Sequence, residues 1–115
     1  MTQTGAILVT LGFEIPIAVA LVAARRWAPG RLGFVAVSSL AASVLTHPIL
    51  WMIDPVLAPA LPDRTLRLAL LESLIVVVEA VVYGLGAGLP PRRALAVSLV
   101  ANAASLGAGI LIYAL

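Results

Sequence analysis

The residues of this sequence that could do chemistry are few, and most of them lie within long apolar stretches. Three of the five acidic residues are Glu14, Glu72 and Glu79, and the single histidine is His47. A neutral imidazole beside carboxylates can ligate a divalent metal ion such as zinc or iron. Ionisable groups in series within a membrane can also relay protons. We therefore predict a cation-binding or relay site formed by these four residues together with Asn102.

A metal ion would take its ligands from several separate segments of the chain. The predicted metal ligands are His47, Glu72 and Glu79, and a divalent metal ion is the cofactor that this set could hold. No Glu-x-x-His or His-Glu-x-x-His motif is present. The ligands would have to converge from different helices, as they do in metal sites built inside helix bundles.

Polar residues recur at intervals of three, four or seven positions, which is the spacing of one face of a helix. The resulting stripes are Thr10 with Glu14, Ser43 with His47, Glu72 with Glu79 and Tyr83, and Ser98 with Asn102 and Ser105. Each helix would then carry one polar stripe on an otherwise apolar surface. We expect Ser43, Tyr83, Ser98 and Ser105 to support the site.

The rise of a helix, about 1.5 Å per residue, predicts how deep each of these residues lies. His47 and Glu72 fall at one depth, and Glu14, Glu79 and Asn102 fall in a second layer near the middle of the membrane. A purely structural alternative uses the same layers. In it, His47 pairs with Glu72, and Glu79 pairs with Asn102 or Tyr83, so that the polar core only holds the helices together.

Two prolines stand beside ionisable residues. Pro16 follows the first glutamate by two positions, and Pro48 directly follows His47. A proline inside a helix cannot donate a hydrogen bond to the carbonyl four residues earlier, here that of Gly12 or Val44. Transporters use interrupted helices of this kind near their binding sites. We predict kinks in the first and second helices, with Pro16 and Pro48 as hinges.

The composition indicates which solvent surrounds these elements. The chain has 115 residues, of which 63% are hydrophobic and 10% are charged. Soluble domains are typically about 45–50% apolar and about 25% charged. This excludes a soluble enzyme, a nucleic-acid binder and a disordered tail, and the absence of cysteine excludes thiolate chemistry. The lipid bilayer is the predicted surrounding, and no nucleic-acid partner is expected.

Four apolar stretches each approach the roughly 20 residues that a membrane-spanning helix needs. They cover residues 5–24, 33–53, 68–86 and 94–114. The predicted fold class is therefore all-α: a polytopic membrane protein with a four-helix bundle, formed by a single domain over residues 1–115. A long polar connection is expected from residue 54 to residue 67.

The arginines predict the orientation. Five of the seven flank the first and third connections, and two lie in the second: Arg25, Arg26, Arg31, Arg92 and Arg93 against Arg64 and Arg67. Cytoplasmic loops carry an excess of positive charge. We therefore predict a multi-pass protein of the cell inner (plasma) membrane, with both termini outside.

Three functions are compatible with this pattern. The first is binding or translocation of a cation, either a divalent metal ion or a proton. The second is an intramembrane metal-dependent enzyme, with Glu79 as a general base. The third is a structural or accessory subunit of a larger complex. Four helices can hardly enclose a wide pore, so we expect a homo-oligomer or partner membrane subunits.

Overall fold

The computed structural model describes the backbone of residues 2–114 and the side chains of residues 2–112. Within that range the chain folds into four α-helices: α1 (Gln3–Arg25), α2 (Leu32–Leu57), α3 (Arg64–Ala87) and α4 (Pro91–Ala114). All four are long and apolar enough to cross a membrane. The predicted all-α bundle of four spans is therefore confirmed.

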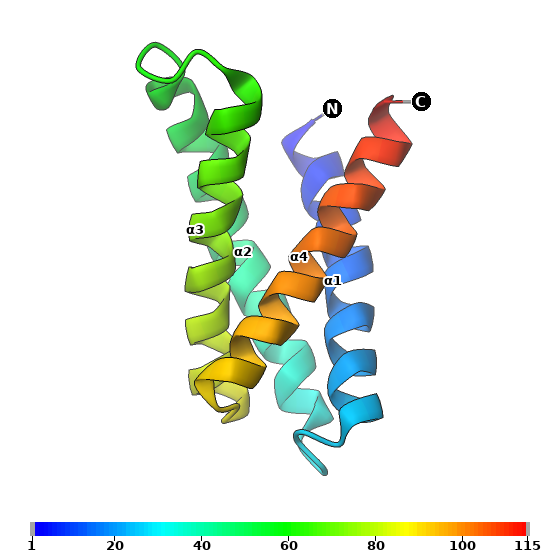
Figure 1. Cartoon of the computed structure of the whole chain (residues 1–115). Helices are drawn as coiled ribbons and strands as arrows, with labels where there is room; N and C mark the ends of the chain where they lie inside the picture. The colour runs from blue at the N-terminus through cyan, green and yellow to red at the C-terminus, as the bar shows by residue number, and fades with distance from the viewer. Residues whose placement is uncertain (1, 115) are drawn as a thin grey trace.

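The helices form a ring in which each one packs against two neighbours. α1 packs against α2 and α4, and α3 packs against the same two helices. Both described ends of the chain and the α2–α3 connection lie at one end of the bundle, which we name the termini end (Figure 1). The α1–α2 and α3–α4 connections lie at the other, which we name the arginine end.

Two helices extend beyond the predicted apolar stretches, one at its end and one at its start. α2 continues through Pro55 to Leu57, and α3 begins at Arg64. The Asp63 side chain caps α3 by accepting hydrogen bonds from the backbone N–H groups of Thr65 and Leu66, at 3.0 and 3.2 Å. The polar connection predicted at residues 54–67 is therefore shortened to residues 58–63.

An ion pair holds the α2–α3 connection against the ends of the two helices that it joins. Arg67 Nε lies 2.6 Å from Asp54 Oδ1, and the guanidinium also donates to the Leu61 carbonyl oxygen at 2.9 Å. One guanidinium thus joins the last turn of α2, the connection and the first turn of α3. At the arginine end, the Arg93 guanidinium in the first turn of α4 lies 5.7 Å from the ring centre of Trp27 in the α1–α2 connection.

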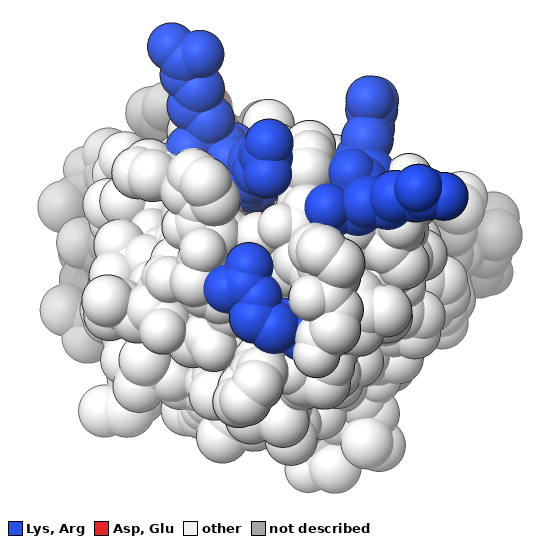
Figure 2. Space-filling model, turned by 90° about the horizontal axis from the view of Figure 1, so that it is seen from below, with Lys and Arg blue, Asp and Glu red and all other residues white. Residues whose placement is uncertain are grey.

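The arginine end carries the positive charge of the bundle. Figure 2 shows arginine side chains spread across this end. They come from the two short connections and the helix ends beside them: Arg25, Arg26, Arg31, Arg92 and Arg93. This is the grouping on which the predicted orientation depends.

The two predicted hinge prolines lie inside continuous helices. Pro16 lies within α1 and Pro48 within α2. Each removes one backbone donor from its helix, but neither ends it. The kinks at these positions stay a prediction.

The half of the bundle next to the arginine end is closed by a tightly packed apolar cluster. Alanine and valine dominate it, and their small side chains allow close approach of helix backbones. Its members are Ala18, Val22, Ala28, Val35, Tyr83, Ala87, Leu89, Ala94, Val97 and Ala101. The half next to the termini end is more open, and the candidate site lies there.

Gly86→Ala is expected to destabilise the protein by about 1–3 kcal/mol, the usual cost of overpacking. A Cβ added at Gly86 would collide with the side chain of Ser38, where α3 meets α2. The free energy of unfolding, measured by SDS titration of the purified protein, tests this. Gly84→Ala is the matched control, because its Cβ would meet only the Leu89 carbonyl oxygen, at an ordinary 3.5 Å.

Ser38→Gly removes the side chain that the new methyl group would meet. In that background Gly86→Ala should cost clearly less than it does in the wild type. An equal cost in both backgrounds would contradict the close approach of α2 and α3 at this point.

Candidate functional site

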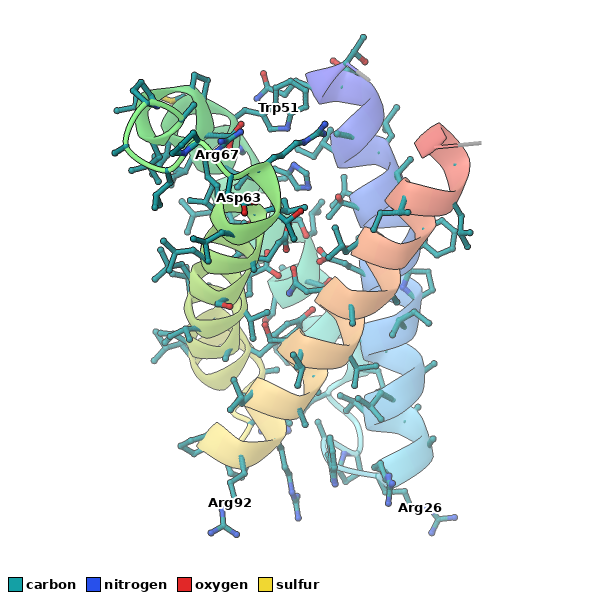
Figure 3. All side chains as sticks on the ribbon, turned by 45° about the horizontal axis from the view of Figure 1, so that its top comes forward. Arg26, Trp51, Asp63, Arg67 and Arg92 are labelled. Carbon is teal, nitrogen blue, oxygen red and sulfur yellow. The ribbon has the colours of Figure 1, made fainter. Side chains whose placement is uncertain are left out.

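A cavity of about 490 Å³ fills the interior of the bundle next to the termini end, and we name it the chamber. All four helices line it. Its polar lining residues are Thr10, Glu14, Thr46, His47, Arg64, Glu72, Glu79, Asn102 and Ser105. The five predicted site residues all belong to this set, so the structure brings them to one cavity. Trp51, which also lines the chamber, lies at the termini end together with Asp63 and Arg67 (Figure 3).

Glu14 lies at the inner end of the chamber, where it is almost fully buried, with 1% of its surface exposed. Its carboxyl group joins α1 to two other helices. Ser43 of α2 donates to Oε2 at 2.5 Å, and the Ser105 hydroxyl of α4 lies 3.1 Å from Oε1. Both serines were predicted supporting residues, and both contact the site directly.

Glu79 has a matching arrangement on α3, with 2% of its surface exposed. Asn102 donates its amide to Oε1 at 2.7 Å, and the Thr46 hydroxyl lies 2.7 Å from Oε2. The structural alternative paired Glu79 with Asn102 or Tyr83, and the structure forms the pair with Asn102. Asn102 is itself fixed by α4, since its amide also lies 2.8 Å from the Ser98 carbonyl oxygen.

Together these bonds form one network across the four helices. Ser105 connects its two halves, because its hydroxyl lies 3.1 Å from Glu14 Oε1 and 3.1 Å from the Asn102 carbonyl oxygen. Serine, threonine and asparagine are the residues that commonly hydrogen-bond between membrane helices. The network fixes the two carboxyl groups relative to one another.

His47 and Glu72 lie nearer the mouth of the chamber and are less constrained. His47 Nε2 lies 2.6 Å from the Thr10 hydroxyl, and Nδ1 is buried with no hydrogen-bond partner among the described residues. No described side chain donates a hydrogen bond to Glu72. The His47–Glu72 pair considered above is not formed: Thr10 of α1 bonds the imidazole at Nε2, and Nδ1 has no partner among the described residues. Both side chains line the chamber with hydrogen-bonding capacity to spare.

The predicted metal ligands share the chamber without gathering at one point. Among residues 2–112 there is no group of three or more His, Asp or Glu side chains that could hold a metal ion. His47 reaches the chamber from α2, and Glu72 and Glu79 reach it from α3. Metal ligation by these three residues stays a prediction.

The chamber has an excess of carboxyl groups over basic ones. Three glutamates line it, and Arg64 is the one lining arginine, in the first turn of α3. Within the described side chains, the one salt bridge joins Arg67 to Asp54 outside the chamber. Glu14 and Glu79 are hydrogen-bonded by hydroxyl and amide groups alone, so no side chain of the described part of the chain balances their charge.

Three of the four predicted supporting residues do not line the chamber: Ser43, Tyr83 and Ser98. Ser98 is fully buried and donates to the Val76 carbonyl oxygen at 2.7 Å, which joins α4 to α3. Tyr83 belongs to the apolar cluster that closes the arginine half. Ser98 therefore positions Asn102, whereas Tyr83 packs below the site.

The sequence interpretation missed Thr46 and Arg64. Thr46 lies three positions after Ser43, so helical spacing could have placed it on the same stripe. The stripe that runs from Ser43 to His47 leaves it out. Arg64 was treated as a topology signal alone, and its position on the chamber depends on the length that the Asp63 cap adds to α3.

Comparison of the chain with protein-family models, with curated proteins and with solved structures gave no match. The chemistry of the chamber is therefore the basis for any functional conclusion.

Proposed function

We propose that this protein binds a cation in the chamber and translocates it in exchange for protons carried by Glu14 and Glu79. The observation that carries the proposal is the pair of buried carboxyl groups with no basic side chain beside them. A charge left unpaired in a membrane interior is costly. A proton or a bound cation removes that cost, and either one can exchange for the other.

Proton counting supports a protonated resting state. The Thr46 hydroxyl has one hydrogen but lies near two acceptors, the Ala42 carbonyl oxygen at 2.9 Å and Glu79 Oε2 at 2.7 Å. Ser105 is in the same position between Glu14 and the Asn102 carbonyl oxygen. If each glutamate donates a proton to the hydroxyl, and the hydroxyl donates to the carbonyl, every acceptor is satisfied.

Glu72 would be the first contact for the cation. It lines the chamber and accepts no hydrogen bond from a described residue, so a ligand would not have to displace a protein donor. The cation would then move toward Glu14 and Glu79 as their protons leave. A divalent metal ion would require these separated ligands to come together, whereas a cation that one carboxyl group can balance would not.

Passage through the bundle would need a second conformation. The chamber opens toward the termini end, and the apolar cluster closes the other half. If the arginine end faces the cytoplasm, as its charge favours, the described conformation faces outward. Pro16 and Pro48 would serve as hinges for the alternative one, in the inner (plasma) membrane and with a second copy or partner subunits completing the pathway.

Proton movement in liposomes tests the proposal. The protein is reconstituted with a pH-sensitive dye inside, and Na⁺, Mg²⁺, Zn²⁺ or tetraphenylphosphonium is added outside. At least one cation is expected to drive proton movement above that of empty liposomes, and the Glu14→Gln/Glu79→Gln double variant should lose it. If no cation moves protons above the level of empty liposomes, the proposal is wrong.

A further inference from the structure

The chamber has a neighbouring cavity on the side of the bundle. A second cavity of about 290 Å³ lies between α3 and α4, and we name it the side opening. It shares three lining residues with the chamber, Glu72, Asn102 and Leu106. Figure 1 shows α3 and α4 close together near the arginine end and diverging toward the termini end.

The side opening faces the surface that lipid would cover. Leu99, which lines it, is 55% exposed, and Ser73 and Ala103 are exposed as well. The Ser73 hydroxyl is bonded to the Ala69 carbonyl oxygen at 2.7 Å. The polar side chains of this cavity that remain available to a ligand are therefore those of Glu72 and Asn102, and apart from Ser73 the rest of the lining is apolar.

The chamber is much larger than a bare ion requires. Sites for drug-sized molecules have volumes of roughly 300–1,000 Å³ and are mainly apolar, with a few polar groups that fix orientation. At about 490 Å³ the chamber falls in this range. Its apolar lining includes Val9, Leu50, Trp51, Leu68, Ile75 and Ile110. Such walls suit an apolar body, and the carboxyl groups suit a positive charge.

The two approaches differ in charge. Arg64 lines the chamber at the termini end and would repel a cation that arrives there. No arginine lines the side opening. An amphipathic cation dissolved in the lipid would therefore meet the carboxyl group of Glu72 first when it comes from the side.

We propose that the cation is an amphipathic organic cation, with an aromatic or alkyl body, that reaches Glu72 from the lipid through the side opening. The proposal rests on the proposed cation exchange and names its substrate class. Trp51 would contact the body of the ligand, since aromatic faces attract cations.

Tetraphenylphosphonium and tetraphenylborate test the ligand class, because they have nearly the same shape and opposite charges. Binding is followed by the fluorescence of Trp51 in a Trp27→Phe protein in lipid nanodiscs. Saturable binding of the cation and none of the anion is expected. Glu72→Gln should weaken cation binding at least about tenfold, as loss of a close charge pair does. Equal binding of both probes, or of neither, would overturn the proposal.

Two phenylalanine variants test the route. Ala103→Phe narrows the side opening, whereas Val100→Phe adds a ring on an exposed part of α4 that lines neither cavity. The association rate of tetraphenylphosphonium should fall about tenfold in Ala103→Phe and stay unchanged in Val100→Phe and Arg64→Gln. Faster association in Arg64→Gln with no change in Ala103→Phe, or equal rates in all variants, would show access from the end and reject the lateral route.

The cation–proton exchange and the class of cation can each fail without the other. Proton movement driven by Na⁺, Mg²⁺ or Zn²⁺ without tetraphenylphosphonium binding would leave the exchange standing and reject the substrate class. Selective tetraphenylphosphonium binding without proton movement by any cation would reject the exchange and leave the ligand class standing.

Discussion

Glu79→Gln is expected to lower cation-driven proton movement at least about 100-fold, the usual scale for loss of a proton-transferring group, while the fold stays intact. Glutamine keeps the oxygen that accepts from Asn102 at 2.7 Å. Its amide can donate to the Thr46 hydroxyl, which in turn donates to the Ala42 carbonyl oxygen. The variant loses only the exchangeable proton and the negative charge.

The comparison with Thr46→Val separates transport from packing. Thr46→Val removes a hydrogen bond to Glu79 and keeps the carboxyl group, and intramembrane hydrogen bonds average about 0.6 kcal/mol. It should retain measurable proton movement. Dye-loaded liposomes report transport, and SDS titration reports the free energy of unfolding. Wild-type proton movement in Glu79→Gln would mean that the network only holds the helices together.

Tyr83→Ala is expected to give the largest loss of stability, about 3–5 kcal/mol, as for other buried aromatic residues cut to alanine. Tyr83 is the largest fully buried side chain in the described part of the chain, with 1% of its surface exposed. It packs in the cluster that closes the arginine half. Its removal leaves a void there that the small alanine and valine neighbours cannot fill.

Tyr83→Phe is the matched control for this prediction. It keeps the ring and removes only the hydroxyl, so the free energy of unfolding should change by less than about 1 kcal/mol. Cation-driven proton movement should persist in this variant. If Tyr83→Phe costs as much stability as Tyr83→Ala, the hydroxyl and not the ring would be the important group.

The four spans could be predicted because apolar length and spacing are properties of single helices. The helix ends were less predictable, since they depend on local capping and on contacts between helices. Arg64 and Arg67 look like loop residues in a hydropathy pattern. In the structure the Asp63 cap starts α3 ahead of them, and Arg67 pairs with Asp54 across the connection.

The sequence could predict how deep the residues of the candidate site lie along their helices, but not the direction in which each helix turns its polar face. The rise per residue correctly placed Glu79 beside Asn102. The same reasoning put His47 level with Glu72, yet His47 bonds to Thr10 of α1. Spacing along one helix gives its polar face, but the direction in which that face turns depends on the packing of all four helices. The side opening depends on the divergence of α3 and α4, which no residue pattern indicates.

The network across the four helices also bears on how the protein is made. Glu14 is hydrogen-bonded to Ser105, a residue 91 positions later in the chain. During synthesis, α1 therefore enters the membrane long before its last partner exists. Until α4 has inserted, Glu14 can bond Ser43 of α2 but not Ser105. The network that joins the four helices is therefore completed only by the last of them.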